Sequence, residues 1–169
     1  MTKNQIEKLK KHLFSNDIKQ VSDSLKIIET EGDSSVIKIL AEALITNDNI
    51  TIKNEIRHFF AKIKSNDTAK YIVQIIEDKR FISEKKFFVS LCWQLPLQFD
   101  EFYDNFLQIF TNDNFEIAFE AFTVIEIITD NKNVSNKTIT EQLNKLNACL
   151  PKLDNQKKLL ATKLIHKLK

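Results

Sequence analysis

The chain has 169 residues, of which 43% are hydrophobic and 28% charged, and its formal net charge is +2. These values are typical of one globular domain that buries its core without disulfides or metals. One glycine and two prolines supply too few turn residues for an all-β fold or a glycine-rich nucleotide loop, so an all-α protein is expected.

Apolar residues recur with helical spacing from one end of the chain to the other, and short polar breaks interrupt them. The breaks contain Asn, Asp and Ser, which favour helix N-termini, and Gly32 suits a left-handed position after a helix. The predicted helices lie near 3–14, 17–30, 34–46, 50–64, 68–78, 83–94, from Asp100, over 115–128, from Ser135 to the turn at Pro151, and from Asp154.

Two helix starts have more specific signals. Asp113 and Glu116 have the spacing of a capping box, in which each side chain satisfies a backbone N–H at the start of a helix. Ser135 is expected to cap the following helix, with Val134 and Ile139 in the positions of a hydrophobic staple.

The stretch 87–128 holds eleven of the sixteen aromatic residues, including the only tryptophan, Trp93, and it contains no Lys or Arg. A segment this apolar is expected to form the central core. Phe115, Phe119 and Phe122 recur at helical spacing, so we expect all three to be buried on one helix.

The polar breaks repeat at intervals of about 32 residues, each followed by two helices, which is typical of helical repeats. They occur at Asn16-Asp17, Asn47-Asp48-Asn49, Lys79-Arg80 and Asn112-Asp113-Asn114. With Asp33, Asp67 and Asp100 at the intervening turns, the chain resembles HEAT or armadillo repeat proteins. The resemblance implies an α–α superhelix (solenoid) of about ten helices in about five pairs, forming one domain over 1–169. A compact, non-repeating helical bundle is the alternative.

The sequence offers little catalytic or cofactor chemistry. His12, His58 and His166 fall in separate helices without metal-ligand spacing, and phosphate-binding and nucleophile motifs are absent. Cys92 and Cys149 lie far apart without Cys-x-x-Cys spacing, and Cys92 in its apolar run is expected to be buried and inert. We therefore expect no cofactor, no metal and no enzymatic activity.

Neither a signal peptide nor a membrane span is recognised, so a cytoplasmic protein without membrane contact is expected. The abundance of Lys, Asn and Ile is typical of AT-rich bacterial genomes. The sequence carries no signal for an oligomeric state.

Charge is distributed unevenly, with eight acidic and no basic residues in 87–131 but nine lysines and two acids in 132–169. Carboxylates four residues apart share a helical face, and without nearby cations they favour a partner with a basic segment. A solvated surface and a catalytic carboxylate pair are the alternatives. The predicted partner-binding residues are Asp100, Tyr103, Asp104, Glu116 and Glu120.

The hypothesis from sequence is a non-enzymatic protein–protein interaction module, a scaffold or adaptor of the HEAT-like class. The alternative is a nucleic-acid-binding solenoid that uses the basic C-terminal section, because lysines bind phosphates and some HEAT-like solenoids bind damaged DNA. The lysines assigned to that alternative are Lys152, Lys157, Lys158, Lys163 and Lys167.

Overall fold

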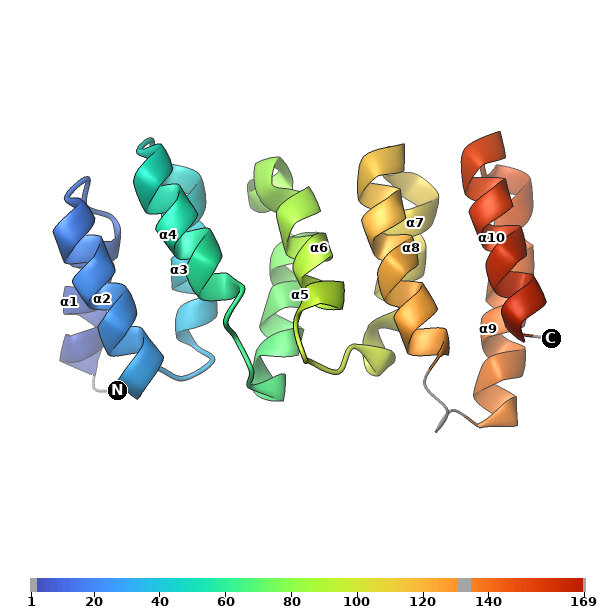
Figure 1. Ribbon diagram of the computed structural model, residues 1–169, viewed down its shortest axis with the longest axis horizontal. Coiled ribbons are helices and arrows are strands. Elements are labelled where there is room, and N and C mark those ends of the chain that lie inside the picture. Colours follow the sequence, from blue (N-terminus) through green and yellow to red (C-terminus); the bar gives the residue numbers. More distant parts are fainter. Residues whose placement is uncertain (1–2, 131–134, 169) are drawn as a thin grey trace. The chain divides into compact units, whose positions relative to one another are not determined.

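The structure is a computed structural model that describes residues 3–130 and 135–168 (Figure 1). These residues form ten α-helices and four short 3₁₀ helices, with no strand among them, so the all-α prediction is confirmed. The chain divides into two compact units, Met1–Leu97 and Gln98–Lys169, which are described separately below. No helix in the described ranges is long and apolar enough to cross a bilayer.

The first unit contains six α-helices and two 3₁₀ helices. Their bounds are α1 Lys3–Leu13, α2 Ile18–Glu31, α3 Val36–Thr46, α4 Ile50–Phe60, η1 Asn66–Thr68, α5 Ala69–Glu77, η2 Lys79–Glu84 and α6 Lys85–Gln94. The second unit contains the rest: η3 Asp100–Phe102, α7 Tyr103–Asn112, α8 Phe115–Thr129, α9 Asn136–Cys149, η4 Leu150–Lys152 and α10 Asn155–Leu168. The predicted helices are therefore present, although α4 ends at Phe60 and not near residue 64.

Polar side chains cap the N-termini of several helices, as the sequence predicts. The Asp17 carboxylate accepts hydrogen bonds from the backbone N–H groups of Lys19 and Gln20. Asn49 and Ser135 act in the same way at the starts of α4 and α9. These side chains satisfy backbone donors that the first turn of a helix leaves without partners.

Two predicted caps differ from the structure. Asn114, and not Asp113, caps α8, because its side chain accepts the hydrogen bond from the Ile117 N–H. Gly32 has a φ of −72°, so it is not left-handed. A glycine fits here because the backbone passes close to the preceding turn of α2, where a Cβ would collide with the carbonyl oxygen of Ile28. The proposed staple of Val134 with Ile139 lies partly outside the described residues.

Within the first unit, successive helix pairs stack through equivalent helices (Figure 1). Consecutive helices pair as α1 with α2, α3 with α4 and α5 with α6. Helix α3 contacts both α1 and α5, and α2 contacts α4. The apolar side of each pair is thus covered by the next pair, which is how repeated helical units bury a shared core.

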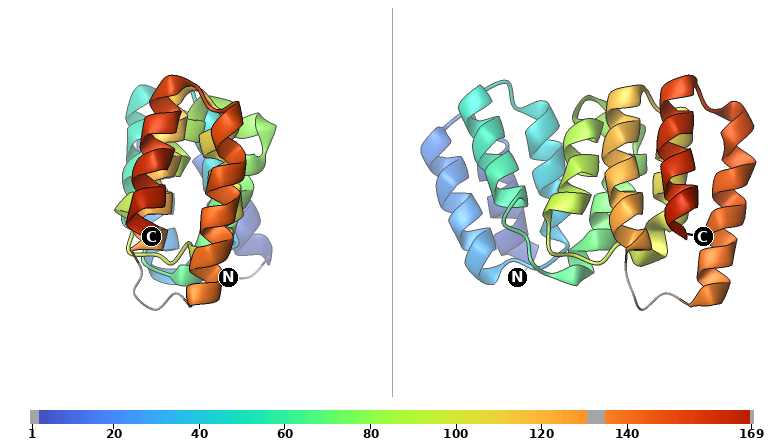
Figure 2. Two further views of the ribbon diagram at one scale, coloured as in Figure 1. Left: turned by 90° about the vertical axis from the view of Figure 1, so that its right-hand side faces the viewer. Right: turned by 45° about the vertical axis from the view of Figure 1, so that its right-hand side comes forward.

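In the second unit, α7 packs closely against α8, α8 against α10, and α10 against α9 (Figure 2). Helix α9 contributes least to the core. Among its described side chains, Gln142 and Leu146 are buried, and Gln142 is polar. Helix α9 is therefore held mainly by its partner α10.

Aromatic rings form a separate cluster in each unit. In the first, the fully buried Phe60 meets Phe88 edge to face, with ring centroids 5.2 Å apart. In the second, Phe106 and Phe110 are fully buried, and Phe110 lies 6.1 Å from Phe122. Such pairs add to the free energy gained by removing the rings from water. The aromatic stretch thus supplies core residues to both units.

A nearly buried carboxylate connects α4 to η2 in the first unit. The side chain of Glu84 is 7% exposed, and it accepts hydrogen bonds from Arg57 Nη2 at 2.8 and 3.0 Å and from Nε at 3.3 Å. Lys53 Nζ lies 3.6 Å from the same carboxylate. The guanidinium also lies 5.9 Å from the centre of the Phe87 ring. The carboxylate is therefore buried together with its counter-charges.

Replacing Arg57 with Met leaves Glu84 buried with only Lys53 as a partner. We expect the R57M variant to lose about 1.5–3 kcal/mol in the free energy of unfolding, the range for hydrogen bonds to charged groups. A second substitution, Glu84→Leu, is expected to restore most of the loss, because it removes the unpaired charge. Urea denaturation followed by Trp93 fluorescence measures both effects. The matched control is Arg80→Met, whose ion pairs are exposed and whose loss is expected to change stability less. An equally stable R57M protein would contradict this assignment.

Candidate functional site

A small polar cleft separates α7 from α9 in the second unit. Four side chains line it from η3 and α7, and four from α9, around a volume of about 180 Å³. The lining residues are Asp100, Glu101, Tyr103, Asp104, Thr138, Glu141, Gln142 and Lys145. Positions 138, 141, 142 and 145 follow helical spacing and therefore share one face of α9. Three of the five predicted partner-binding residues, Asp100, Tyr103 and Asp104, line this cleft.

An ion pair crosses the cleft and corrects one expectation. Lys145 Nζ lies 2.6 and 2.7 Å from the two carboxylate oxygens of Asp104. The expectation that these acids lack a nearby cation is therefore wrong for Asp104. It failed because the partner lies 41 residues away in the sequence. The pair is largely exposed, so its contribution to stability is small.

Two buried polar atoms beside the cleft have no hydrogen-bond partner. They are the Tyr103 hydroxyl and the Gln142 Oε1, and no other buried side-chain atom of the described residues shares this condition. Tyr103 is 6% exposed and Gln142 is 5% exposed. Burial, and then the nearby Asp104 and Cys149, raises the pKa of the Tyr103 phenol. Tyr103 is thus a buried wall of the cleft and not an exposed aromatic contact.

The other two predicted residues, Glu116 and Glu120, lie on α8 and do not line the cleft. They directly follow Phe115 and Phe119, the two exposed aromatic residues that we call the α8 outer face. The five predicted residues therefore belong to two surfaces and not to one.

The α8 outer face corrects the prediction that Phe115, Phe119 and Phe122 are all buried. Only Phe122 is buried, whereas Phe115 is 38% and Phe119 46% exposed. The rings of Phe119 and Phe122 are stacked, with centroids 6.2 Å apart, and Phe115 lies 6.1 Å from Phe119. The aromatic row thus begins in the core and continues to the surface. Ile127 is 51% exposed on the same helix.

The basic C-terminal section is largely engaged within the second unit. Lys157 is 5% exposed, and its ammonium group donates hydrogen bonds to the carbonyl oxygens of Thr111 at 3.3 Å and Asp113 at 2.6 Å. A cation is favourable there because the carbonyl end of α7 carries partial negative charge. Lys157 is therefore a structural residue, which corrects its assignment to nucleic-acid binding.

Other lysines of this section pair with acids of α8 and its C-terminus. Lys167 Nζ lies 2.6 Å from Asp130 and 3.6 Å from Glu126, and Lys163 Nζ lies 3.7 Å from Glu126. The carboxylate of Asp130 raises the pKa of Lys167. Two of the five predicted lysines have no such bonds among the described residues, namely the exposed Lys152 and the half-buried Lys158.

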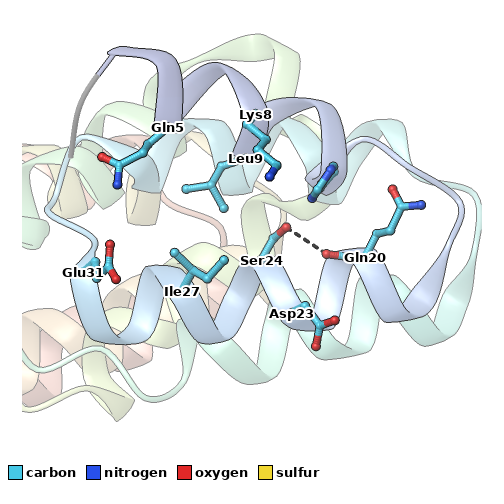
Figure 3. A pocket seen from close by; sticks show the side chains of 9 residues that line it. Gln5, Lys8, Leu9, Gln20, Asp23, Ser24, Ile27 and Glu31 are labelled. Atoms are coloured by element: carbon cyan, nitrogen blue, oxygen red, sulfur yellow. Dashed lines mark hydrogen bonds between the residues drawn. The ribbon is translucent and has the colours of Figure 1, made fainter.

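A larger groove, of about 400 Å³, runs between α1 and α2 in the first unit (Figure 3). Leu9 and Ile27 line its centre, and Lys8, Asp23 and Glu31 lie at its sides. Charges of both signs surround it, so its chemistry selects no class of ligand.

The described residues offer no metal centre, and the thiol of Cys92 lies in the core. Within 3–130 and 135–168, no three His, Cys, Asp or Glu side chains converge as metal ligands do. Cys92 is buried, its thiol donates to the Phe88 carbonyl oxygen at 3.3 Å, and burial raises the pKa of the thiol. The expectation that Cys92 is a core residue is confirmed.

Sequence reasoning missed the α9 side of the cleft. A signal for it exists, because Gln142 lies three residues after Ile139 and four before Leu146, on the inward face of a predicted helix. A polar residue at such a position either finds a buried partner or marks a site.

Replacing Tyr103 with Phe removes a buried hydroxyl that lacks a partner. We expect Y103F to raise the free energy of unfolding by about 1 kcal/mol, and the melting temperature by about 2–4 °C. Thermal unfolding by circular dichroism tests this. Tyr71→Phe, at a half-buried tyrosine of the first unit, is the matched control and is expected to change little. A lower melting temperature for Y103F would show that the hydroxyl is satisfied in solution.

The raised pKa of Tyr103 also predicts how stability depends on pH. Below pH about 10 the phenol is protonated in both folded and unfolded chains. Above it the unfolded chain loses the proton while the folded chain retains it, so stability falls as pH rises. We expect the urea midpoint to fall more steeply above pH about 10 in the wild type than in Y103F. Equal slopes would contradict a buried, protonated phenol.

In comparisons with known proteins, no family model, no curated protein and no solved structure matches the chain. The function is therefore inferred from the two surfaces of the second unit, the polar cleft and the α8 outer face.

Proposed function

We propose that the protein is a non-enzymatic interaction module of the HEAT-like α–α repeat class, which binds a partner protein through the α8 outer face. The repeat assignment is supported by the stacking of equivalent helices within each unit: α1 with α3, α3 with α5, α2 with α4, and α8 with α10. Repeat proteins of this kind use the surfaces of stacked helices to bind other proteins.

The observation that carries the proposal is the exposure of Phe115 and Phe119 on a helix whose opposite side is fully buried. Exposed apolar residues that occur singly need no explanation, whereas contiguous apolar surface is typical of interaction sites. Aromatic side chains bring a large contact area with few rotatable bonds, so they act as anchors in interfaces. Because the Phe115–Phe119–Phe122 rings touch, the exposed rings are supported from the core.

The charge of α8 indicates what kind of partner fits. The helix carries Glu116, Glu120 and Glu126 and no lysine or arginine. Glu126 forms ion pairs with Lys163 and Lys167 of α10. Glu116 and Glu120 directly follow Phe115 and Phe119 in the sequence. A partner segment that combines apolar side chains with Lys or Arg complements this surface, because unlike charges speed association and fix the register of docking.

The nucleic-acid alternative gains no comparable support, since Lys157, Lys163 and Lys167 form bonds within the unit. A catalytic role for the carboxylates is not favoured either. Asp104 is bound to Lys145, and Glu116 and Glu120 lie on another helix outside the cleft. The proposal therefore assigns binding and not catalysis to this surface.

The proposal is tested by replacing Phe119 with a photo-crosslinking phenylalanine analogue in the native host and identifying the protein that is captured. That protein, purified, is then titrated against the wild type and the double variant Phe115→Ser/Phe119→Ser. We expect the double variant to bind about 10-fold or more weakly, because aromatic anchors dominate interface energies. Glu116→Lys/Glu120→Lys is expected to slow association mainly.

The matched control is Leu159→Ser, because Leu159 is also exposed but lies on α10, outside the α8 outer face. It should bind the partner as the wild type does. Equal affinity of the Phe115→Ser/Phe119→Ser variant and the wild type would overturn the assignment of this face, provided both remain folded by circular dichroism.

A further inference from the structure

The cleft between α7 and α9 contains an imbalance between hydrogen-bond acceptors and donors. Asp100, Glu101, Asp104 and Glu141 contribute carboxylates, which when ionised accept hydrogen bonds and cannot donate them. Lys145 is the one cation among the described residues that line the cleft, and it is bound to Asp104. The formal charge of the lining is therefore negative by three.

Two buried side chains in the walls of the cleft also have a polar atom without a hydrogen-bond partner. Gln142 Oε1 is an acceptor without a donor, and the Tyr103 hydroxyl can accept as well as donate. Both side chains are more than nine-tenths buried and both line the cleft. A buried polar atom without a partner destabilises the fold, so two such atoms in one small cleft need an explanation.

The volume and shape of the cleft limit what can fill it. About 180 Å³ is less than the 300–1,000 Å³ that is usual for sites of drug-sized ligands. The space suits one side-chain-sized group. A metal ion fits poorly, because among the described residues no three carboxylates, imidazoles or thiols converge on a point. The acceptors instead line both sides of the cleft, which suits an organic cation with several N–H donors.

We propose that the α7–α9 cleft binds a guanidinium group, with Tyr103 and Gln142 accepting hydrogen bonds at its walls and Glu101 and Glu141 providing negative charge. Guanidinium has five N–H donors in a plane, whereas an ammonium has three donors around one point, so guanidinium can reach acceptors on both helices. It is also more weakly hydrated than ammonium, which lowers the cost of entering a partly buried site. The site is separate from the α8 outer face and does not depend on it.

The test uses the 169-residue protein labelled with ¹⁵N and follows backbone amide signals during titration with methylguanidinium. We expect saturable shifts at amides of α7 and α9, weakened by added salt because the attraction is electrostatic. Butylammonium at the same concentrations is expected to bind about 10-fold more weakly, because it offers fewer donors. Equal or tighter binding of butylammonium, or the absence of saturable shifts in the cleft, would overturn the proposal.

Variants separate binding from folding. Gln142→Leu removes an unpaired buried acceptor, so it should leave the protein as stable as the wild type or more so while weakening methylguanidinium about 10-fold. Glu141→Gln, on the exposed rim, is expected to weaken binding severalfold. The matched control Glu29→Gln, an exposed glutamate of the first unit, should bind like the wild type. Undiminished binding to both Gln142→Leu and Glu141→Gln would place the cation elsewhere and reject the site.

Two further titrations identify the source of the guanidinium. The capped peptide acetyl-Ala-Arg-Ala-amide presents it as a protein side chain, and free L-arginine presents it as a small molecule. Tighter binding of the peptide indicates an arginine of a partner protein, and tighter binding of the free amino acid indicates a metabolite; either result supports the site. The Phe115→Ser/Phe119→Ser variant should bind methylguanidinium unchanged, so failure of the proposed function and failure of this site are distinguishable.

Discussion

The stacking of successive helix pairs is the constraint on which each unit depends, because a pair of short amphipathic helices cannot cover its own apolar side. In the first unit α3 contacts both α1 and α5. The fully buried rings of Phe60 on α4 and Phe88 on α6 meet edge to face. In the second unit α8 is held by α7 and α10, whereas α9 is held mainly by α10. The polar cleft lies where this packing is weakest, between α7 and α9.

The acidic and basic sections of the sequence partly neutralise each other through ion pairs. The acidic section and the basic section meet in the second unit, where Lys145 binds Asp104 and Lys167 binds Asp130. Lys157 is used differently, since its ammonium group is buried against carbonyl oxygens at the end of α7. Burial of a lysine is tolerated there because hydrogen-bond acceptors replace water. Further acids line the cleft and lie on α8, and they give both surfaces negative charge.

Local signals in the sequence were sufficient for the helices, because apolar spacing and Asn, Asp or Ser at the breaks act within a few residues. They were insufficient to predict the exposure of Phe119 and the burial of Lys157. Helical spacing shows that Phe115, Phe119 and Phe122 lie near one another, but only the neighbouring helices decide which of them is covered. Lys157 meets its acceptors 44 and 46 residues away, and no local pattern encodes that contact. The contact of Lys145 with Asp104 in the candidate site spans 41 residues and was missed for the same reason. The inward position of Gln142, in contrast, can be seen in the helical spacing of its own helix.

Tyr103 and Gln142 give the strongest reason to regard the cleft as more than a packing defect. Phenylalanine has nearly the shape of tyrosine, and leucine nearly that of glutamine. Phenylalanine at position 103 and leucine at position 142 would therefore fill the same space without leaving a polar atom unsatisfied. Proteins are stable by a margin small enough for one such atom to matter. Unsatisfied polar atoms that arise by chance would be expected at scattered positions, yet these two line the same cleft. Both side chains are uncharged, so they do not neutralise the carboxylates beside them. A donor-rich cation is the kind of group that satisfies the buried atoms and the charges together.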